Sequence, residues 1–493
     1  MEMYKNTKLN KDDITQIAQD ATDWATIHGI VMRNGKHKHL TNFAPFMLFP
    51  TPFPTYLYDE AMMVQKDFHT LVHRASLDHE FIHSSLKSVI VHDEFTKRQY
   101  EIYDQVRKEG IKPKFNFNII RSDYMVDETK KDVVVNGHTL EEIRPYEIKQ
   151  IEVNMIAASF GGLDSKVEKL HRYMADVIGQ NCPYKKDQVA TNTTLENLAD
   201  GMAKLWQLYG NEDAVIIFVV EKGDSNRFDQ KTLEYSFHDS ITRLGIKKHV
   251  PVLFRCLEQI YENGKLNEDG SLIFEKKEVA LCYFRAGYAP SHFQCEEAWK
   301  GRLMIERSTV PKCPNMAEQL VGTKKIQQVF AAPGMVERFI QDAEAVKRIR
   351  RTFAGLYTLD PGADGDAAAE MALNVPSRYV LKPQREGGGN NMYDNDMVTE
   401  LKRITDPVER SQYILMERVQ PPIVKNYIVH VDHDKPSLAD TVTELGVFGV
   451  FISDGEKEIF NKASGHLLRT KDIEHKDGGV AAGRAVLDTP YLI

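Results

Sequence analysis

The segment Val380–Tyr393 combines a cation, a carboxylate, two amides and three successive glycines. Lys382 follows a short β-prone run, and Glu386 supplies a hard oxygen ligand. Gly387–Gly389 then allow backbone N–H groups to approach a ligand closely. A polyphosphate with Mg²⁺ requires this combination of groups. A polar surface loop explains the isolated segment equally well, and the segment is neither a Walker A loop nor a Rossmann fingerprint.

Three further side chains with oxygen ligands could bind a cation or need one as a partner. Glu152 and Asn154 share one face of a strand predicted at residues 148–156, so both oxygens could reach one metal. Their spacing alone favours a solvated strand face. Glu444 lies in an almost entirely apolar strand predicted at residues 441–452, where a carboxylate needs a partner or a metal.

Basic residues at predicted strand and loop ends complete the candidate site. Lysines suit phosphates, and the guanidinium fork binds carboxylates bidentately. The candidates are Lys324, Lys382 and Lys471 for phosphates and Arg121, Arg285 and Arg469 for carboxylates. The run Met416–Val419 suits an adenine edge, whereas the basic cluster at 347–351 is more simply a solvated helix face. These residues predict an enzyme that uses ATP and Mg²⁺ on acidic small molecules.

Composition narrows the class of protein. The chain has 493 residues, 42% of them hydrophobic and 27% charged, which predicts a soluble globular protein with two or three cores. A net charge of −8 gives no basic field for nucleic acid or an anionic membrane. Five cysteines without a CxxC pair indicate reduced thiols, and no signal peptide or membrane span is recognisable. We therefore expect a cytoplasmic protein.

The elements that must position these residues follow from hydrophobic periodicity. Alternating strands and helices at 213–320 predict a compact α/β subdomain that binds ligands at its strand ends, near Asp224–Asn226. The proline-rich segment 43–58 must be extended, and Gly161-Gly162 predicts a tight exit from the preceding strand. Helices are predicted at 12–30, 60–110 with a break near 92–93, 230–244 and 316–355, and other strands at 115–120, 213–220, 250–254, 279–284 and 413–419.

Ordered motifs over nearly the whole chain resemble those of the eukaryotic glutathione synthetase family, whose members are ATP-grasp ligases. The resemblance rests on I-I-R-S-D-Y-M at 119–125, I-E-V-N-x-I-A-A-S-F-G-G-L at 151–163, V-L-K-P-Q-R-E-G-G-G-N-N-x-Y at 380–393 and L-L-R-T-K-x-I-E-H-x-D-G-G-V-A-A-G at 467–483.

The resemblance implies an α/β architecture: an ATP-grasp fold with an inserted, doubly wound α/β substrate-binding subdomain and a lid. The implied divisions are the N-terminal part of the ligase body at 1–212, the subdomain at 213–320 and the C-terminal ATP-grasp part at 321–493, with a lid at about 360–440 and a substrate-closing loop at about 467–485. It also implies a homodimer that ligates γ-glutamylcysteine and glycine to glutathione, with ATP giving ADP and phosphate through an acyl phosphate.

The resemblance assigns roles residue by residue. Two Mg²⁺ ions would be held by Glu152, Asn154 and Glu386. The ATP-binding set would be Glu152, Lys324, Lys382, Glu386, Gly387, Gly388, Gly389, Asn390, Asn391, Tyr393, Met416, Glu417, Arg418, Val419, Glu444, Lys471 and Asp477. The substrate-binding set would be Arg121, Ser159, Asp224, Ser225, Asn226, Gln230, Arg285, Tyr288, Arg469, Val480 and Ala481, with Arg121 and Arg469 acting in catalysis.

Two departures from the family pattern stand out. Ala157 occupies a position where the family commonly has serine, and the segment between Asp123 and Ile148 is longer than usual, which predicts a surface insertion. Three alternatives stay open: a homoglutathione-forming ligase that uses β-alanine, a catalytically silent nucleotide-binding scaffold and a metabolite kinase. The pair Ala481-Ala482 resembles the glycine-using type, and retention of the proposed ligands speaks against a silent scaffold.

Overall fold

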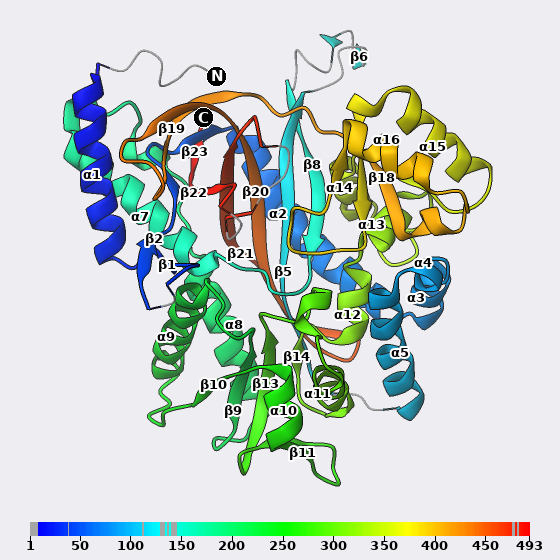
Figure 1. Ribbon diagram of the computed structural model, residues 1–493. Helices are drawn as coiled ribbons and strands as arrows, with labels where there is room; N and C mark the ends of the chain where they lie inside the picture. The colour runs from blue at the N-terminus through cyan, green and yellow to red at the C-terminus, as the bar shows by residue number, and fades with distance from the viewer. Residues whose placement is uncertain are drawn as a thin grey trace.

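The centre of the protein is a seven-stranded sheet in the order β19-β3-β22-β21-β20-β5-β8. The computed structural model describes residues 8–37, 39–110, 113–128, 134–135, 138–139, 145–475, 479–480 and 483–493. Because β19 also pairs with β20, five of the strands close into a ring, while β5 and β8 extend the sheet beyond it (Figure 1). The strands are β3 (Phe46–Met47), β5 (Asn116–Glu128), β8 (Tyr146–Asn154), β19 (Val424–Val429), β20 (Ser437–Asp454), β21 (Lys457–Asp472) and β22 (Val486–Asp488).

Helices cover both faces of β20, which explains why residues 445–452 of that strand are apolar and buried. Helix α2 (Thr55–Ser76) packs on one face and α8 (Thr194–Tyr209) on the other. Glycines permit the close approach: a Cβ at Gly449 would lie 2.0 Å from His69 Cε1, and one at Gly201 would lie 2.5 Å from Val450 Cγ1. The strand is therefore held tightly between two helical layers.

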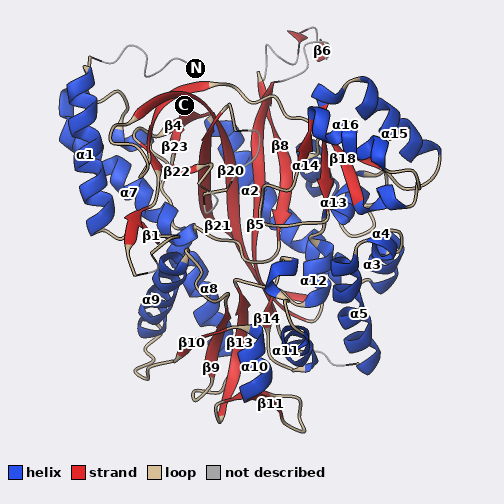
Figure 2. Cartoon of the chain, viewed as in Figure 1, coloured by secondary structure: helices blue, strands red, loops and turns tan. Residues whose placement is uncertain are grey.

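The segment 213–320 forms a separate sheet whose central strands are parallel, as the alternating pattern predicts. Side chains of β9 alternate between two cores: Ile217 packs with Ile260 of α10 on one face, and Phe218 packs with Phe237 of α9 on the other. The elements are β9 (Val215–Val219), α9 (Arg227–Arg243), β10 (Val252–Arg255), α10 (Leu257–Asn263), β11 (Gly264–Leu266), β12 (Leu272–Phe274), β13 (Lys277–Phe284), α11 (Glu296–Arg307) and β14 (Lys312–Cys313). This doubly wound unit lies below the central sheet in Figure 2.

A four-stranded antiparallel sheet with its own small core occupies the range for which a lid is predicted, and we call this unit the lid. Two ion pairs join it to the body: Lys325 Nζ lies 2.6 Å from Asp360 Oδ2, and Arg385 Nη1 lies 2.5 Å from Asp93 Oδ2. The elements are β15 (Leu356–Thr358), α15 (Ala363–Asn374), β16 (Tyr379–Pro383), β17 (Met392–Tyr393), α16 (Asp394–Arg403) and β18 (Tyr413–Glu417). The unit lies at the upper right of Figure 1.

The range 316–355, predicted as helical, contains three separate helices with a non-helical stretch at 332–342. They are α12 (Met316–Val321), α13 (Lys324–Ala331) and α14 (Ala343–Thr352). Gly322 ends the first, where a Cβ would lie 2.4 Å from Met155 Cγ, and Pro333-Gly334 follow the second. The break divides the range so that Lys324 and Lys325 stand at a helix N-terminus.

Local signals explain the other differences at element boundaries. The predicted break near 92–93 is confirmed, and Asp93 caps the following helix by accepting a hydrogen bond from Thr96 N at 2.7 Å. Gly161-Gly162 do not leave the strand in a turn; they open α7 (Gly161–Ile178) directly after Phe160, whose φ is 72°. The other elements are α1 (Lys11–Ile27), β1 (Val31–Arg33), β2 (Thr41–Phe43), β4 (Thr51–Phe53), α3 (His79–Leu86), α4 (Val89–His92), α5 (Glu94–Glu109), β6 (Val134–Val135), β7 (His138–Thr139) and β23 (Pro490–Leu492).

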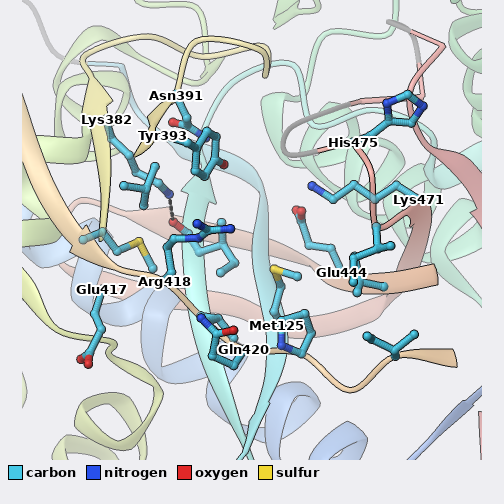
Figure 3. A pocket seen from close by; sticks show the side chains of 18 residues that line it. Met125, Lys382, Asn391, Tyr393, Glu417, Arg418, Gln420, Glu444, Lys471 and His475 are labelled. Carbon is cyan, nitrogen blue, oxygen red and sulfur yellow. Dashed lines mark hydrogen bonds between the residues drawn. The ribbon is translucent and has the colours of Figure 1, made fainter. Parts of the chain in front are cut away.

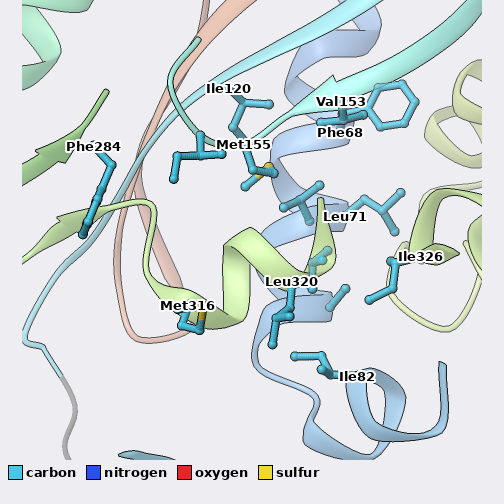
Figure 4. Packing of buried hydrophobic residues seen from close by; sticks show 14 of the residues in the cluster. Phe68, Leu71, Ile82, Ile120, Val153, Met155, Phe284, Met316, Leu320 and Ile326 are labelled. Carbon is cyan, nitrogen blue, oxygen red and sulfur yellow. The ribbon is translucent and has the colours of Figure 1, made fainter. Parts of the chain in front are cut away.

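A single hydrophobic cluster joins the central sheet, the subdomain and the helices next to the lid. Figure 4 shows Leu320 of α12 in one cluster with Leu71 of α2 and with Met155, which directly follows β8. Phe284, at the end of β13, belongs to the same cluster. The site residues carried by these elements therefore stand on one continuously packed support. Among helices in the described part of the chain, none is long and apolar enough to span a bilayer.

Candidate active site

Two pockets adjoin where the lid meets the central sheet. We call the first, of about 270 Å³ between the lid strands and β20–β21, the lid pocket. The second, of about 160 Å³ between the glycine loop and the ends of β5 and β8, is the sheet pocket. Ile151, Asn391 and Glu444 line both. Groups bound in the two pockets would thus be neighbours across a shared wall.

The lid pocket gathers most of the residues predicted to bind ATP. Figure 3 shows Lys382 and Tyr393 on one side and Glu444, Lys471 and His475 on the other. Lys382 is buried, and its Nζ donates a hydrogen bond to Ile151 O at 2.8 Å. The predicted residues that line this pocket are Lys382, Asn391, Tyr393, Met416, Glu417, Arg418, Val419, Glu444 and Lys471.

Apolar surface and charge are separated within the lid pocket. Met416, at the end of β18, is 1% exposed and lies beside apolar wall residues that include Val380 and Val442. The carboxylate of Glu417 points away from the centre and is 3.1 Å from Arg378 Nη2 (Figure 3). An apolar slot with lysines at its edges suits a flat base attached to a chain of phosphates.

The three glycines of the loop all adopt left-handed backbone conformations. Their φ angles are 99°, 70° and 76° for Gly387, Gly388 and Gly389. Residues with a Cβ rarely adopt such angles, so the run of three glycines is required for this path. Gly387 also lies against Tyr288, since a Cβ there would be 3.2 Å from Tyr288 Cε2. The loop therefore borders the sheet pocket, which Gly387 and Gly388 line.

Two of the predicted metal ligands face one ammonium group. Lys324 Nζ lies 3.1 Å from Glu152 Oε2 and 2.8 Å from Glu386 Oε1. Burial alone would raise the pKa of Glu152, but the charges of Lys324, Lys382 and Arg469 outweigh it and hold that pKa below its usual value. Burial raises the pKa of Glu386 to about 7, against the opposing charge of Lys324.

Asn154, the third predicted metal ligand, lines the sheet pocket together with Glu152 and Glu386. Asn154 donates its amide hydrogen to Asp123 Oδ2 at 2.8 Å, so its amide oxygen points away from that carboxylate. Across the described residues, no set of three acidic, histidine or cysteine side chains converges as a metal centre. Two carboxylates and an amide still fit Mg²⁺, because this ion commonly takes one or two carboxylates and completes its shell with water and phosphate oxygens.

The sheet pocket holds two of the three predicted carboxylate-binding arginines. Arg469 Nη2 lies 2.8 Å from Asp123 Oδ2 and also contacts Glu444. Arg121 Nη1 donates to the backbone oxygen of Ser159 at 3.1 Å. The predicted residues that line the pocket are Arg121, Glu152, Asn154, Ser159, Tyr288, Lys324, Glu386, Gly387, Gly388, Asn390, Asn391, Glu444, Arg469 and Val480.

The remaining predicted substrate residues lie at the edge of the subdomain and line neither pocket. Arg285 is buried in an ion pair, with its Nη1 3.0 Å from Asp229 Oδ2. Gln230 Nε2 donates to Asp224 Oδ2 at 2.5 Å, and Ser225 and Asn226 precede α9. Asp477 and Ala481 lie outside the described residues.

Two aspartates near the site were not among the residues predicted from the sequence. Asp229 accepts hydrogen bonds from Phe160 N at 3.0 Å and Gly162 N at 2.9 Å, and thereby ties the subdomain to the start of α7. Asp123 contacts both arginines of the sheet pocket. The only sequence signal was the position of Asp123 two residues after Arg121, which places both on one strand face.

Comparisons with known proteins agree with this geometry. The sequence profile of a family described as eukaryotic glutathione synthase, ATP binding domain, matches residues 11–492. Among similar proteins, a glutathione synthetase of Rattus norvegicus is 41% identical over 488 residues, which are 98% of each chain. A chloroplastic glutathione synthetase of Arabidopsis thaliana is 35% identical over 497 residues, which cover 99% of this chain and 87% of that protein.

The fold also has a solved counterpart. A glutathione synthetase-like effector from Globodera pallida, in its apo form, superposes with a TM-score of 0.75 over 99% of this chain and 98% of that one. At 24% sequence identity this likeness supports the fold alone. The predicted α/β architecture is confirmed.

Proposed function

The chain belongs to the eukaryotic glutathione synthase family and is an ATP-dependent ligase, and we propose that its two pockets join γ-glutamylcysteine to glycine. The observation that carries this proposal is the wall that the pockets share at Ile151, Asn391 and Glu444. A phosphate chain in the lid pocket and a carboxylate in the sheet pocket would be adjacent. Positioning and charge neutralisation would then supply most of the rate enhancement.

The lid pocket would hold ATP. Met416 and Val419 would flank the adenine, while Lys382 and Lys471 would neutralise phosphates from opposite sides of the pocket. Asn390, Asn391 and the glycine loop would cover the triphosphate, because three left-handed glycines leave backbone N–H groups accessible to phosphate oxygens.

Glu152, Asn154 and Glu386 would hold Mg²⁺. Mg²⁺ bound there would neutralise the negative charge that accumulates on the transferring phosphoryl group. Lys324 lies between the two carboxylates and lines the sheet pocket, so its ammonium could turn toward phosphate oxygens.

The sheet pocket would orient the dipeptide. Arg121 and Arg469 would bind its carboxylates, while Ser159, Tyr288 and Val480 would form the surrounding wall. Asp224, Ser225, Asn226, Gln230 and Arg285 line neither pocket and would need to come closer when the lid closes.

The ligation would proceed in two balanced steps. The cysteinyl carboxylate attacks the terminal phosphorus of ATP, a P–O bond to ADP breaks, and an acyl phosphate forms. The glycine amine then attacks the acyl carbon, the C–N bond forms, and phosphate leaves while the amine loses a proton. Exclusion of water by the lid would protect the acyl phosphate from hydrolysis.

The organisation around this site is also part of the proposal. We assign residues 1–212 and 321–493 to the ligase body and 213–320 to the substrate-binding subdomain, with a lid at about 360–440. A cytoplasmic homodimer is the expected form. Apolar side chains that are strongly exposed, such as Ile27 at 79% and Met63 at 58%, are candidate sites for a subunit contact.

The test is ADP release by the purified protein with ATP, Mg²⁺ and γ-glutamylcysteine, with and without glycine or β-alanine. Release that depends strongly on glycine supports the proposal. Release with β-alanine alone would indicate homoglutathione, and release without any amine acceptor would indicate a kinase. Absence of release despite ATP binding would leave a silent scaffold.

A further inference from the structure

Asp123 is fully buried behind the residues that line the sheet pocket, and none of the roles above falls to it. We infer that Asp123 is a positioning residue, a buried carboxylate that fixes the orientation of both substrate arginines and of the amide of Asn154. The inference rests on the proposed function and adds a specificity determinant for an anionic substrate. Four hydrogen bonds and one glycine support it.

The strongest contact is a two-pronged ion pair on β5. Arg121 donates through Nε to Asp123 Oδ1 at 2.7 Å and through Nη2 to Oδ2 at 2.8 Å. Asp123 is 0% exposed, so this pair is shielded from water. Two parallel hydrogen bonds fix the plane of a guanidinium group as well as its position. Arg121 therefore cannot turn without breaking both.

The same carboxylate holds the second arginine from another strand. Arg469 of β21 donates through Nη2 to Asp123 Oδ2 at 2.8 Å. Both arginines line the sheet pocket. Arg121 also donates to Ser159 O and Arg469 to Glu444, and the N–H groups left by these contacts and by Asp123 remain for a ligand. Because the guanidinium groups are oriented before binding, less conformational entropy is lost when they capture a carboxylate.

Asn154 of β8 is oriented by the same oxygen. Its amide nitrogen donates to Asp123 Oδ2 at 2.8 Å. A carboxylate accepts hydrogen bonds and donates none, so only the nitrogen of the amide can face it. The amide oxygen is thereby turned away from Asp123. One buried aspartate thus sets pocket residues on three strands.

Gly446 supports the inference independently of the charges. It pairs with Asp123 across β20 and β5. A Cβ at this position would lie 2.7 Å from Arg121 Cδ and 2.7 Å from Asp123 Oδ1. Its φ lies outside the left-handed range, so the glycine supplies space for the ion pair and not a special backbone conformation. A side chain here would displace the arginine without removing any charge.

The experiment compares Asp123→Asn and Gly446→Ala with the unaltered chain, and uses Asp67→Asn as the matched control. Asp67 accepts an equivalent fork from Arg348, at 2.7 and 3.0 Å, between α2 and α14 and away from both pockets. Calorimetry measures the Kd for γ-glutamylcysteine without ATP or Mg²⁺, and steady-state kinetics measure each KM.

We expect Asp123→Asn to raise the dipeptide Kd and KM by about tenfold or more, because one partner of several charge-assisted hydrogen bonds is lost. Gly446→Ala should raise the same constants, and both variants should change the KM for ATP by less than about twofold. The Asp67→Asn control should leave all of them unchanged. An Asp123→Asn protein with the dipeptide affinity of the unaltered chain would overturn the inference.

Crystal structures of Asp123→Asn and Gly446→Ala give a readout that does not depend on activity. Displaced guanidinium groups at Arg121 and Arg469 support the positioning role, and unmoved groups refute it. If Asp123→Asn does not fold, Gly446→Ala decides, since it retains every charge. Failure of the unaltered protein to release ADP with glycine would reject the proposed function alone, because the two crystal structures still answer this question.

Discussion

The lid pocket and the sheet pocket differ in how their charges are held. In the lid pocket, Lys382 and Lys471 approach from separate elements, one from the lid and one from β21. In the sheet pocket, Lys324 is already paired with Glu152 of the pocket wall, and Arg121 and Arg469 are paired with Asp123, which is buried behind it. The first pocket is thus assembled by lid position, whereas the second is oriented in advance by ion pairs.

This difference predicts two kinds of failure. A substitution in the lid pocket should affect the nucleotide and depend on lid closure. A substitution in the sheet pocket should also disturb the neighbours that were paired with the lost group, because an unpaired charge in a buried place is costly. Residues on the shared boundary should affect both ligands.

The largest effect is expected for Glu386→Gln, in the sheet pocket next to the glycine loop. The change removes a charged ligand for a cation that bridges phosphates, so turnover should fall by about 100-fold or more. Steady-state kinetics at saturating Mg²⁺ measure this. Glu337→Gln, which loses an ion pair with Arg350 outside both pockets, is the control and should keep its turnover. Near-normal turnover in Glu386→Gln would contradict the ligand role.

Arg469→Ala should weaken binding of the dipeptide much more than binding of ATP. We expect the KM for the dipeptide to rise by about tenfold or more and the KM for ATP to change by less than about threefold. Initial rates with one substrate varied at a time measure both constants. An unchanged dipeptide KM would count against a sheet pocket specific for carboxylates.

Lys471→Ala should have the opposite preference and affect ATP more than the dipeptide. Lys471 lies two residues after Arg469, on the same face of β21. Lys471 lines the lid pocket and does not line the sheet pocket. The KM for ATP should rise by about tenfold, because one phosphate contact of opposite charge is lost, while the KM for the dipeptide stays within about twofold. Equal shifts in both constants would mean that the two pockets act as one.

Lid closure should be visible without any substitution. A non-hydrolysable ATP analogue should protect the backbone at Gly387–Gly389 from proteolysis, since a loop that covers phosphates becomes ordered. Limited proteolysis followed by mass spectrometry locates the cuts. The same digestion pattern with and without the analogue would argue that the loop is not part of a nucleotide-dependent lid.

The smallest effect concerns a buried carboxylate that lacks an arginine fork. Asp488 accepts hydrogen bonds from Thr470 Oγ1 at 2.5 Å and Thr489 N at 2.7 Å, and burial raises its pKa to about 7. Between about pH 4 and 7 the folded chain therefore keeps this proton, whereas the unfolded chain has lost it. The contribution of Asp488 to the free energy of unfolding is full below about pH 4 and is lost as the pH rises to about 7.

Asp488→Asn should remove that contribution. The unfolding free energy of the unaltered chain, measured by urea denaturation, should fall relative to the variant by about 1 kcal/mol per pH unit between pH 4 and 7. Parallel pH profiles for the two proteins would show that Asp488 titrates normally.

The glycine loop and the strands of the lid pocket were easier to find in the sequence than the aspartates that support the sheet pocket, for a physical reason. The lid-pocket residues at 380–393 and 416–419 lie in two short runs whose glycines and strand patterns are local signals. Asp123 and Asp229 are single acidic residues without such a signal. Their importance arises from strand register and from contacts more than thirty residues away, which periodicity does not report.

The predicted element boundaries were wrong where contact with a neighbouring element decides where a helix begins or ends. Gly322 interrupts the predicted helix at 316–355 because α12 passes directly over Met155. Gly161-Gly162 look like a turn in sequence but start a helix that must approach Thr194 and Asp229 closely. In both cases a neighbour distant in sequence explains why the residue is glycine. The glycines marked a boundary in the sequence, but the sequence did not show what kind of boundary it was.

The ring of strands has a consequence for synthesis of the protein. Strand β22 (Val486–Asp488) lies beside β3 (Phe46–Met47), and β23 pairs with β4. On a ribosome, residues 46–53 must wait for more than 430 further residues to emerge before these pairings can form. Until then β3 and β4, whose residues are all buried in the folded protein, lack these partners. The nascent chain should accordingly depend on chaperones until translation reaches these strands.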